Sequence, residues 1–342
     1  MCYLSASTVF RLKRGGPGRG RVAAAATKWL EVPTMAVEKV APGIERLVSL
    51  NAEIEWLASG FGGLFEDGGV KGVAEGPVWF HEKKHLLFSD NANSKRYRWT
   101  ADKGVELYKE GTNDANGMTR DPQGRLLACE HATRRVTREE LDGSITVVAN
   151  NYRGFALNRP NDICVKSDGA IYFTDPITMR VDTELDFAGV YRVSPDLARV
   201  NLVVRDFVLP NGIALSPDES ILYVNDSLRM HIRAFTFDTF NNTGLLNLAS
   251  DRVFCQMGGS LPGAPDGMKA DSEGNVWCTG PGGIWIIDPA GRHLGTILAG
   301  DKHITNFCFG GDDLTTLFVT GLWEFGRVEV KVRGLPTPRN KK

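Results

Sequence analysis

Residues 210–226 read PNGIALSPDESILYVND. The stretch contains a polar head at Pro210-Asn211-Gly212, a short apolar strand, a Ser-Pro-Asp turn and a second strand rich in β-branched and aromatic residues. The same order recurs five more times, with heads at Glu75, Asn116, Asn161, Asp266 and Asn306. The chain therefore carries six copies of one unit.

The spacing of the six heads indicates how the copies assemble. Successive heads lie roughly 40 to 55 residues apart, a period typical of closed or stacked repeats. A third strand-like segment follows most of the second strands, for example Gly189-Val190-Tyr191-Arg192-Val193. The sequence therefore predicts an all-β fold over residues 35–335, a six-bladed β-propeller with four-stranded blades around a central channel.

The heads predict a cation site in that channel. In a propeller the first strand of each blade lines the channel, so the six heads are expected to form a ring at its mouth. Two heads are carboxylates and four are carboxamides, and converging oxygens suit a hard cation such as Ca²⁺ or Mg²⁺. A lone Asn-Gly or Asp-Gly is more often a hairpin turn. Here apolar strand residues follow the head in every copy, which favours the ring.

The two ends of the chain lie outside the repeats. Residues 1–34 are basic, with no acidic residue before Glu31, and are expected to be a disordered extension or a transit-like leader. Residues 54–58 are the best candidate for a strand that pairs with the last blade and closes the ring. Residues 336–342, with two prolines and two terminal lysines, are expected to be a frayed tail.

Composition excludes several classes of partner. The 342-residue chain has a net charge of −1 and 42% hydrophobic residues, so neither nucleic acid nor a membrane surface is an expected partner. No apolar run approaches the ~20 residues of a membrane span. The six cysteines show no C-x-x-C pair, which favours free thiols in a reducing compartment and a cytoplasmic location. No oligomeric state follows from the sequence.

Three side chains near the heads have two interpretations each. Arg159 lies two residues before Asn161, where it can fork onto a substrate oxygen or pair with a blade carboxylate. His131, after the second strand of its blade, is a proton shuttle or a loop histidine. Asp175 ends a second strand, where it contacts substrate or caps its own loop.

Other catalytic signatures are absent from the sequence. There is no G-x-S-x-G motif for a nucleophilic serine and no G-x-x-x-x-G-K phosphate loop. His81 and His85 lie four positions apart but fall across a predicted turn, so a histidine-bound zinc site is not expected. The oxygen ring is the remaining candidate site.

Several motifs around the heads form a set. They are Ala74-Glu75-Gly76-Pro77, Arg159-Pro160-Asn161-Asp162, Tyr172-Phe173-Thr174-Asp175-Pro176, Leu209-Pro210-Asn211-Gly212, Pro265-Asp266-Gly267-Met268 and Thr305-Asn306 with Phe309-Gly310-Gly311. Together they resemble the gluconolactonase / SMP-30 / luciferin-regenerating-enzyme family of six-bladed propellers, over about residues 70–330.

The resemblance implies roles for the ring residues. Glu75, Asn211 and Asp266 match the family's ligands for one divalent cation, with Asn161 as an additional ligand or substrate contact. Calcium is the expected ion, with Mg, Mn and Zn as alternatives. Asp266 is implied to be the catalytic base, and Arg159 a substrate contact; His131 and Asp175 are further candidate substrate contacts.

The implied reaction is hydrolysis of a sugar-acid lactone, a small-molecule substrate. The cation would polarise the lactone carbonyl, and Asp266 would take a proton from water or attack directly. Two other functions use the same scaffold. One is metal-dependent hydrolysis of other esters or organophosphates, and the other is a non-catalytic calcium-binding regulatory role.

Overall fold

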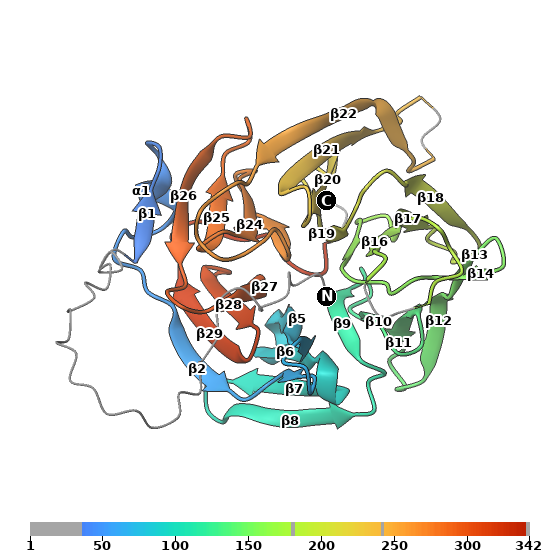
Figure 1. Ribbon diagram of the computed structural model, residues 1–342, viewed down its shortest axis with the longest axis horizontal. Helices are drawn as coiled ribbons and strands as arrows, with labels where there is room; N and C mark the ends of the chain where they lie inside the picture. Colours follow the sequence, from blue (N-terminus) through green and yellow to red (C-terminus); the bar gives the residue numbers. More distant parts are fainter. Residues whose placement is uncertain (1–35, 179–181, 241–242, 340–342) are drawn as a thin grey trace, which may run out of the picture.

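The computed structural model describes residues 36–178, 182–240 and 243–339. Six small antiparallel sheets surround one axis in this part of the chain (Figure 1). The predicted six-bladed β-propeller is therefore confirmed. The predicted leader at 1–34 lies outside the described residues. No helix in the described ranges is long and apolar enough to cross a membrane.

Each blade is numbered here by its order in the chain. Blade I contains β5(Ala74–Phe80), β6(His85–Asp90), β7(Lys95–Thr100) and β8(Gly104–Glu110). Blade II contains β9(Ala115–Arg120), β10(Leu126–Glu130), β11(Arg135–Glu139) and β12(Ile145–Ala149). Blade III contains β15(Ile163–Val165), β16(Ile171–Asp175), β17(Gly189–Val193) and β18(Val200–Val204). Blade IV contains β19(Pro210–Leu215), β20(Ile221–Asp226), β21(His231–Phe237) and β22(Leu246–Gln256).

The last two blades also use N-terminal strands. Blade V contains β23(Met268–Ala270), β24(Val276–Gly280), β25(Gly283–Ile287), β26(His293–Leu298) and β1(Val37–Lys39). Blade VI contains β27(Ile304–Gly310), β28(Thr316–Gly321), β29(Glu324–Glu329) and β2(Glu55–Ser59). Outside the blades lie α1(Ile44–Leu47), the short helices η2(His81–Lys83) and η3(Asn91–Asn93), and the hairpins β3(Gly63–Leu64)–β4(Val70–Gly72) and β13(Asn151–Tyr152)–β14(Phe155–Ala156).

Ring closure joins the two ends of the propeller sequence. Glu55 pairs with Arg327 and Ser59 with Glu324, so β2 is the outer strand of blade VI. This confirms the closing strand predicted at residues 54–58. Blade V departs from the four-strand prediction, because Val37 pairs with Ile297 and adds β1 as a fifth strand. Both pairings cover sheet edges that would otherwise be exposed.

The core lies between adjacent blades. Since successive side chains of a strand point to opposite faces, a blade packed between two neighbours buries both faces. At the junction of blades I and VI, Trp79 stacks on Phe318 with ring centroids 5.4 Å apart, and Phe88 stacks on Phe325 at 4.7 Å. Burial on both faces explains why second strands such as Ile171–Asp175 are mostly apolar.

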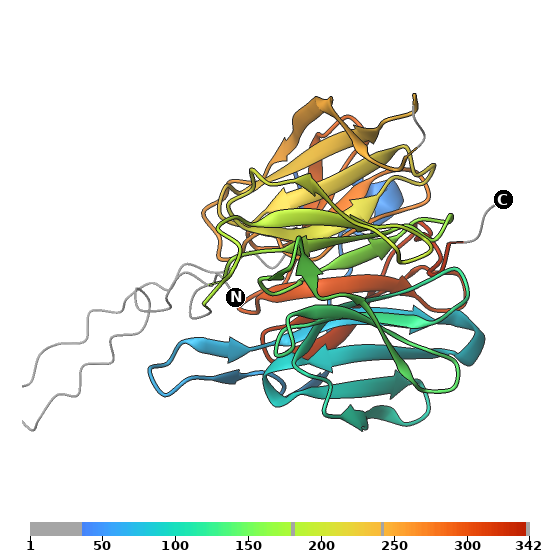
Figure 2. The same ribbon diagram turned by 90° about the vertical axis from the view of Figure 1, so that its right-hand side faces the viewer.

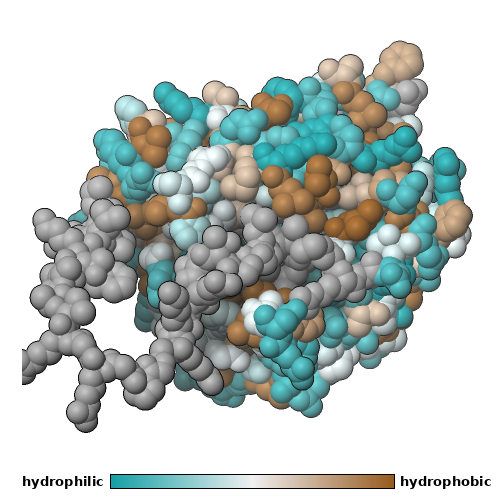
Figure 3. All heavy atoms as spheres, viewed as in Figure 1, coloured by the Kyte–Doolittle hydropathy of each residue, from teal (hydrophilic) through white to brown (hydrophobic). Residues whose placement is uncertain are grey.

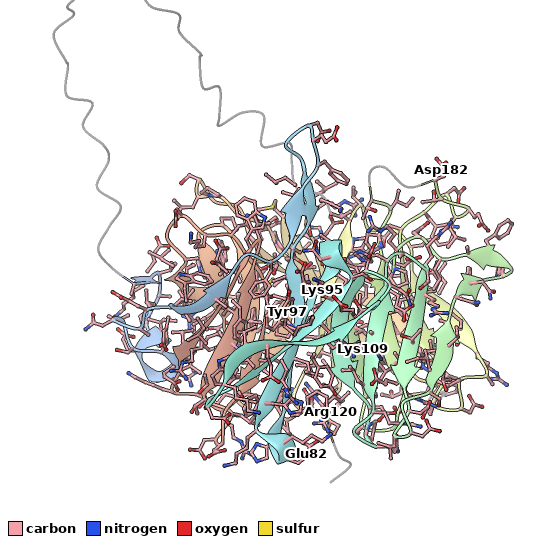
Figure 4. The ribbon with its side chains drawn as sticks, turned by 90° about the horizontal axis from the view of Figure 1, so that it is seen from below. Glu82, Lys95, Tyr97, Lys109, Arg120 and Asp182 are labelled. Carbon is pink, nitrogen blue, oxygen red and sulfur yellow. The ribbon has the colours of Figure 1, made fainter. Side chains whose placement is uncertain are left out.

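Different residues and segments lie at the two ends of the central channel. Figure 4 shows Arg120 and Glu82 at one end of the molecule and Asp182 at the other. The β3–β4 hairpin projects at the Asp182 end, and the described C-terminal residues lie at the opposite end (Figure 2). The Asp182 end is called here the pocket end, and the Arg120 end is called the tail end.

The C-terminal residues lie across the tail end of the channel. Leu335, Thr337 and Arg339 line a cavity there together with first-strand residues of all six blades. Arg120 donates to the Thr337 carbonyl at 3.3 Å, and Arg339 donates to the Leu215 and Ser216 carbonyls at 2.9 and 2.7 Å. The predicted frayed tail is therefore wrong as far as residue 339, because Arg339 provides donors for main-chain carbonyls of blade IV.

The described cysteines are unpaired. Cys129, Cys164, Cys255, Cys278 and Cys308 are free thiols, and all but the half-buried Cys164 are buried. Burial raises the pKa of the Cys129 and Cys308 thiols, which keeps them protonated and unreactive. The prediction of free thiols is confirmed for these five residues.

Candidate functional site

The six heads meet at the pocket end of the channel. Glu75, Asn116, Asn211 and Asn306 lie on the first strands β5, β9, β19 and β27. Asn161 and Asp266 directly precede the first-strand region of blades III and V. Five of the heads line one pocket: Glu75, Asn116, Asn161, Asn211 and Asp266. The structure therefore brings together the four residues predicted to hold the cation.

A chain of hydrogen bonds runs around part of this ring. Asn91 Nδ2 donates to Asn116 Oδ1 at 2.7 Å, and Asn116 Nδ2 donates to Asn161 Oδ1 at 3.0 Å. The Asn161 amide in turn donates to Asn211 Oδ1. Asn211 Nδ2 then donates to the Ser227 hydroxyl at 3.1 Å. Because every amide in the chain donates to the next, the direction in which each amide oxygen points is fixed.

Two buried carboxylates complete the ring. Glu75 Oε2 accepts hydrogen bonds from the Asn306 amide at 2.9 Å and from the Gly76 main chain at 2.7 Å. Burial, together with the nearby Asp162 charge, raises the pKa of Glu75 to about 7. Burial and the Glu75 charge raise the pKa of Asp266 well above its ordinary value. The two acids thus repel each other in a desolvated site, where a positive charge between them would be stabilising.

Sequence reasoning missed two charged residues behind the ring. Asp162 is buried, and its Oδ2 atom has no hydrogen-bond partner. Lys269 Nζ lies 4.0 Å from that oxygen and 3.2 Å from Asn306 Oδ1. Asp162 directly follows a head, and Lys269 follows another by three positions, so the repeat alignment was the signal that could have found them.

The same pocket holds the predicted substrate contacts Arg159 and His131. The Arg159 guanidinium is mostly buried, with its Nη2 atom 3.0 Å from His131 Nδ1 and its Nη1 atom 3.5 Å from Thr178 Oγ1. No carboxylate in the described part of the chain pairs with it within 4.0 Å. The Asp114 carboxylate acts on Arg159 only at longer range, so the described residues do not show the ion pair with a blade carboxylate that the alternative interpretation requires.

A second set of pocket residues occupies the same position in each of four blades. Each follows the acid that ends the second strand of its blade: Asn91, His131, Pro176 and Ser227. All four line the pocket. Only His131 was singled out from the sequence. The position after the second-strand acid is therefore a further repeat signal for this site.

Asp175 supports the pocket wall from behind. It is fully buried and does not line the pocket. Its two carboxylate oxygens accept the main-chain N–H groups of Asn158 at 2.8 Å and Arg159 at 2.7 Å. Asp226 binds the N–H groups of Val208 and Leu209 in the same way in blade IV. We therefore assign Asp175 a positioning role in place of the predicted substrate contact.

Asp175 should give the fold a measurable pH dependence. Burial raises its pKa from 3.8 to about 7. A carboxyl that binds its proton more tightly in the folded state stabilises the fold at low pH, and that contribution is lost as the pH rises through about 7. In Asp175→Asn, the free energy of unfolding should therefore fall less between pH 5 and pH 8 than in the wild type. Urea unfolding at both pH values measures this difference, and equal slopes would show that Asp175 is already ionised at pH 5.

The rim of the pocket end is partly apolar. Figure 3 shows hydrophobic side chains among hydrophilic ones on this face. The exposed apolar side chains on this face include Leu64 of the projecting β3–β4 hairpin and Ile177, which directly follows the pocket residue Pro176. An apolar rim over a few convergent polar groups is typical of a small-molecule site.

The donor set of the ring fits a hard divalent cation. In the described part of the chain, no three His, Cys, Asp or Glu side chains gather as a metal site. The ring instead offers two carboxylates, Glu75 and Asp266, and the amide oxygens of Asn161 and Asn211. Oxygen ligands with few charges suit Ca²⁺ or Mg²⁺ better than Zn²⁺, which favours nitrogen and sulfur.

Comparison with known proteins identifies the family. Residues 73–322 match the SMP-30/Gluconolactonase/LRE-like region. The chain belongs to this family. A gluconolactonase from Zymomonas mobilis is 32% identical over 324 residues, covering 87% of each protein. Regucalcin from Danio rerio is 31% identical over 258 residues, covering 73% of this chain and 83% of the relative.

A solved gluconolactonase structure has a fold similar to that of this chain. It is XC5397 from Xanthomonas campestris, described as a gluconolactonase, with 29% identity and a TM-score of 0.74. The alignment covers 86% of this chain and 94% of that one. The matched region in this chain includes all six heads, and so the family resemblance drawn from the head motifs is confirmed.

Proposed function

We propose that this chain is a divalent-metal-dependent lactonase that hydrolyses a sugar-acid lactone. The observation that carries the proposal is that Glu75, Asn161, Asn211 and Asp266 line one pocket together with Arg159. Sugar lactonases among the relatives give the substrate class. Calcium is the proposed ion because the donors are oxygens only.

Glu75, Asn211 and Asp266 would hold the cation, with Asn161 as an additional ligand. When bound, the ion supplies Lewis-acid polarisation of the lactone carbonyl and a positive charge for the developing oxyanion. The hydrogen bonds from Asn116 to Asn161 and from Asn161 to Asn211 keep these amide oxygens in place. Asn306 does the same for the Glu75 carboxylate. The ring is thus held in place by its own hydrogen bonds before substrate enters.

Asp266 is the proposed base. It accepts a proton from the attacking water, the ring C–O bond breaks, and the alkoxide that leaves takes up that proton from Asp266 to give the open hydroxy acid. Contact with a cation lowers the basicity of a carboxylate, but a lactone is an activated ester that needs little assistance. Direct attack by Asp266 on the carbonyl is the alternative route. Arg159, which lines the same pocket, would donate to a substrate oxygen.

Removal of the metal should abolish the activity. With glucono-δ-lactone as substrate, proton release in weak buffer should fall at least about 10²-fold after EDTA treatment, the scale of one lost oxyanion contact. Added Ca²⁺ should restore it. The matched control is the uncatalysed opening of the lactone at the same pH, with and without EDTA.

The lactone assay with and without EDTA also distinguishes the lactonase from the two alternatives, a hydrolase of other esters or organophosphates and a non-catalytic calcium-binding protein. If full lactonase activity persists in excess EDTA, the metal-dependent mechanism is wrong. If calcium binds but no lactone opens faster than in buffer, the site has a regulatory role. A phosphotriester or aryl ester that is hydrolysed much faster than any lactone would indicate a different hydrolase.

A further inference from the structure

His131 has one partnered and one unpartnered ring nitrogen in the pocket wall. The residue follows β10, and its main-chain N–H donates to the Asp114 carbonyl at 3.3 Å. The side chain is buried and lines the pocket. Its Nδ1 atom contacts Arg159 Nη2 at 3.0 Å, whereas its buried Nε2 atom has no hydrogen-bond partner.

The Arg159 contact determines where the ring carries its hydrogen. A guanidinium has five N–H donors and no acceptor, and it stays protonated in proteins. Nδ1 must therefore present its lone pair to Arg159. A neutral imidazole with a bare Nδ1 carries its hydrogen on Nε2. The geometry thus fixes His131 as the Nε2–H tautomer.

This tautomer excludes one role of His131 and favours another. Nε2 has no lone pair to accept a proton, and Nδ1 is engaged by Arg159, so His131 is not the proton shuttle considered from the sequence. It is a hydrogen-bond donor on a side chain that lines the pocket. A buried donor without an acceptor is costly, and native structures rarely leave one unless a ligand completes it.

Acceptors next to the ring do not complete a hydrogen bond with Nε2. The Glu130 carboxylate, next in sequence, accepts hydrogen bonds from Asn113, Thr133, Arg135 and Thr137. The Asn161 side chain and the Pro160 carbonyl are the acceptors that act on the His131 ring, but neither completes a hydrogen bond with Nε2, and Asn161 Oδ1 already accepts from Asn116. Arg159 on the other side only donates. This wall of the pocket therefore offers donors to whatever binds there.

We propose that His131 is a specificity-determining residue that donates its Nε2–H to an oxygen substituent of the lactone. This rests on the proposed lactonase function and names the residue that selects a hydroxylated lactone over one without hydroxyls. The substrate must carry a hydroxyl or equivalent acceptor oxygen beyond the ester group, as polyhydroxylated lactones do. A site built around a buried donor rejects a ligand that lacks the acceptor far more strongly than a hydrophobic pocket does.

The first test compares two lactones in two variants. Glucono-δ-lactone carries ring hydroxyls, and δ-valerolactone carries none. His131→Leu should lower kcat/KM for gluconolactone by about 10- to 100-fold and leave valerolactone within about 3-fold. His131→Gln places an N–H donor at a similar reach and should keep most of the preference. His231→Gln is the matched control, because His231 is also buried with an unpartnered Nε2 but lies outside the pocket lining.

The second test does not depend on turnover. Nitrogen-15 NMR of the resting protein, with the His131 signal assigned through His131→Gln, should show a bare Nδ1 and a protonated Nε2. Arg159→Met should relax this tautomer preference. Added gluconate, the hydrolysis product, should shift the Nε2–H signal in the wild type.

The outcomes separate the two proposals. If the wild type opens neither lactone faster than buffer, the lactonase function fails, while the NMR result still decides the tautomer. If gluconolactone is hydrolysed and His131→Leu keeps the wild-type preference between the two lactones, the specificity role is overturned. A hydrogen found on Nδ1 overturns it too, even where His131→Leu does not fold.

Discussion

Asp266→Asn should lower kcat/KM for glucono-δ-lactone by about 10³-fold or more, since general-base catalysis alone contributes about 10²- to 10⁴-fold. The substitution keeps the size of the side chain and one oxygen but removes the negative charge and the basic site. The Glu75 carboxylate remains in the ring, because its hydrogen bonds come from Asn306 and Gly76 and not from Asp266. Initial-rate measurements at saturating Ca²⁺ check the expected loss.

Asp271→Asn is the matched control for this variant. Asp271 is a buried carboxylate of the same blade that accepts hydrogen bonds from Asn275 and Trp277 at the tail end. Its replacement should reduce stability and leave kcat/KM per folded molecule nearly unchanged. Wild-type activity in Asp266→Asn would rule out Asp266 as base and as nucleophile alike.

Glu75→Gln should weaken cation binding and lactonase activity together. Loss of groups that merely support a metal ligand costs about 10- to 100-fold in affinity, so loss of a charged ligand should cost at least about 10²-fold. Calorimetric Ca²⁺ titration and lactone hydrolysis over a range of Ca²⁺ concentrations should show the same shift. At very high Ca²⁺, part of the activity should return, since Asp266 is still present.

Glu82→Gln provides the comparison in the same blade. Glu82 pairs with Arg120 at the tail end, away from the pocket, and about half of its side chain is exposed. This variant should bind Ca²⁺ and open lactone as the wild type does. If Glu75→Gln also keeps full affinity and full activity, the assignment of Glu75 as a ligand is wrong.

The ring was predictable because the repeat encodes it directly. Each head lies at the same position before an apolar strand, so the six heads align in the sequence. Closure of the propeller then brings these aligned residues together in space. The pairing of residues 54–58 with the last blade was predictable for a related reason. A closed ring needs a strand from its beginning to cover its end.

Other features depend on contacts that no local pattern records. The pairing of β1 with β26 joins Val37 to Ile297 across most of the chain, and a three-residue strand has little signal of its own. Lys269 and Asp162 approach each other only through closure of the ring. The role of Asp175 also depends on such contacts. Its position at a strand end could be predicted from the sequence, but the direction of its carboxylate, toward the N–H groups before Asn161, could not.

The C-terminal residues across the tail end have a kinetic consequence. Because Leu335, Thr337 and Arg339 line the cavity at that end, we expect lactone to enter and hydroxy acid to leave at the pocket end, where the described residues form the candidate site. An acid that lingers beside Arg159 would obstruct the next substrate molecule. Progress curves should therefore slow before the lactone is exhausted, and added product should act as a competitive inhibitor.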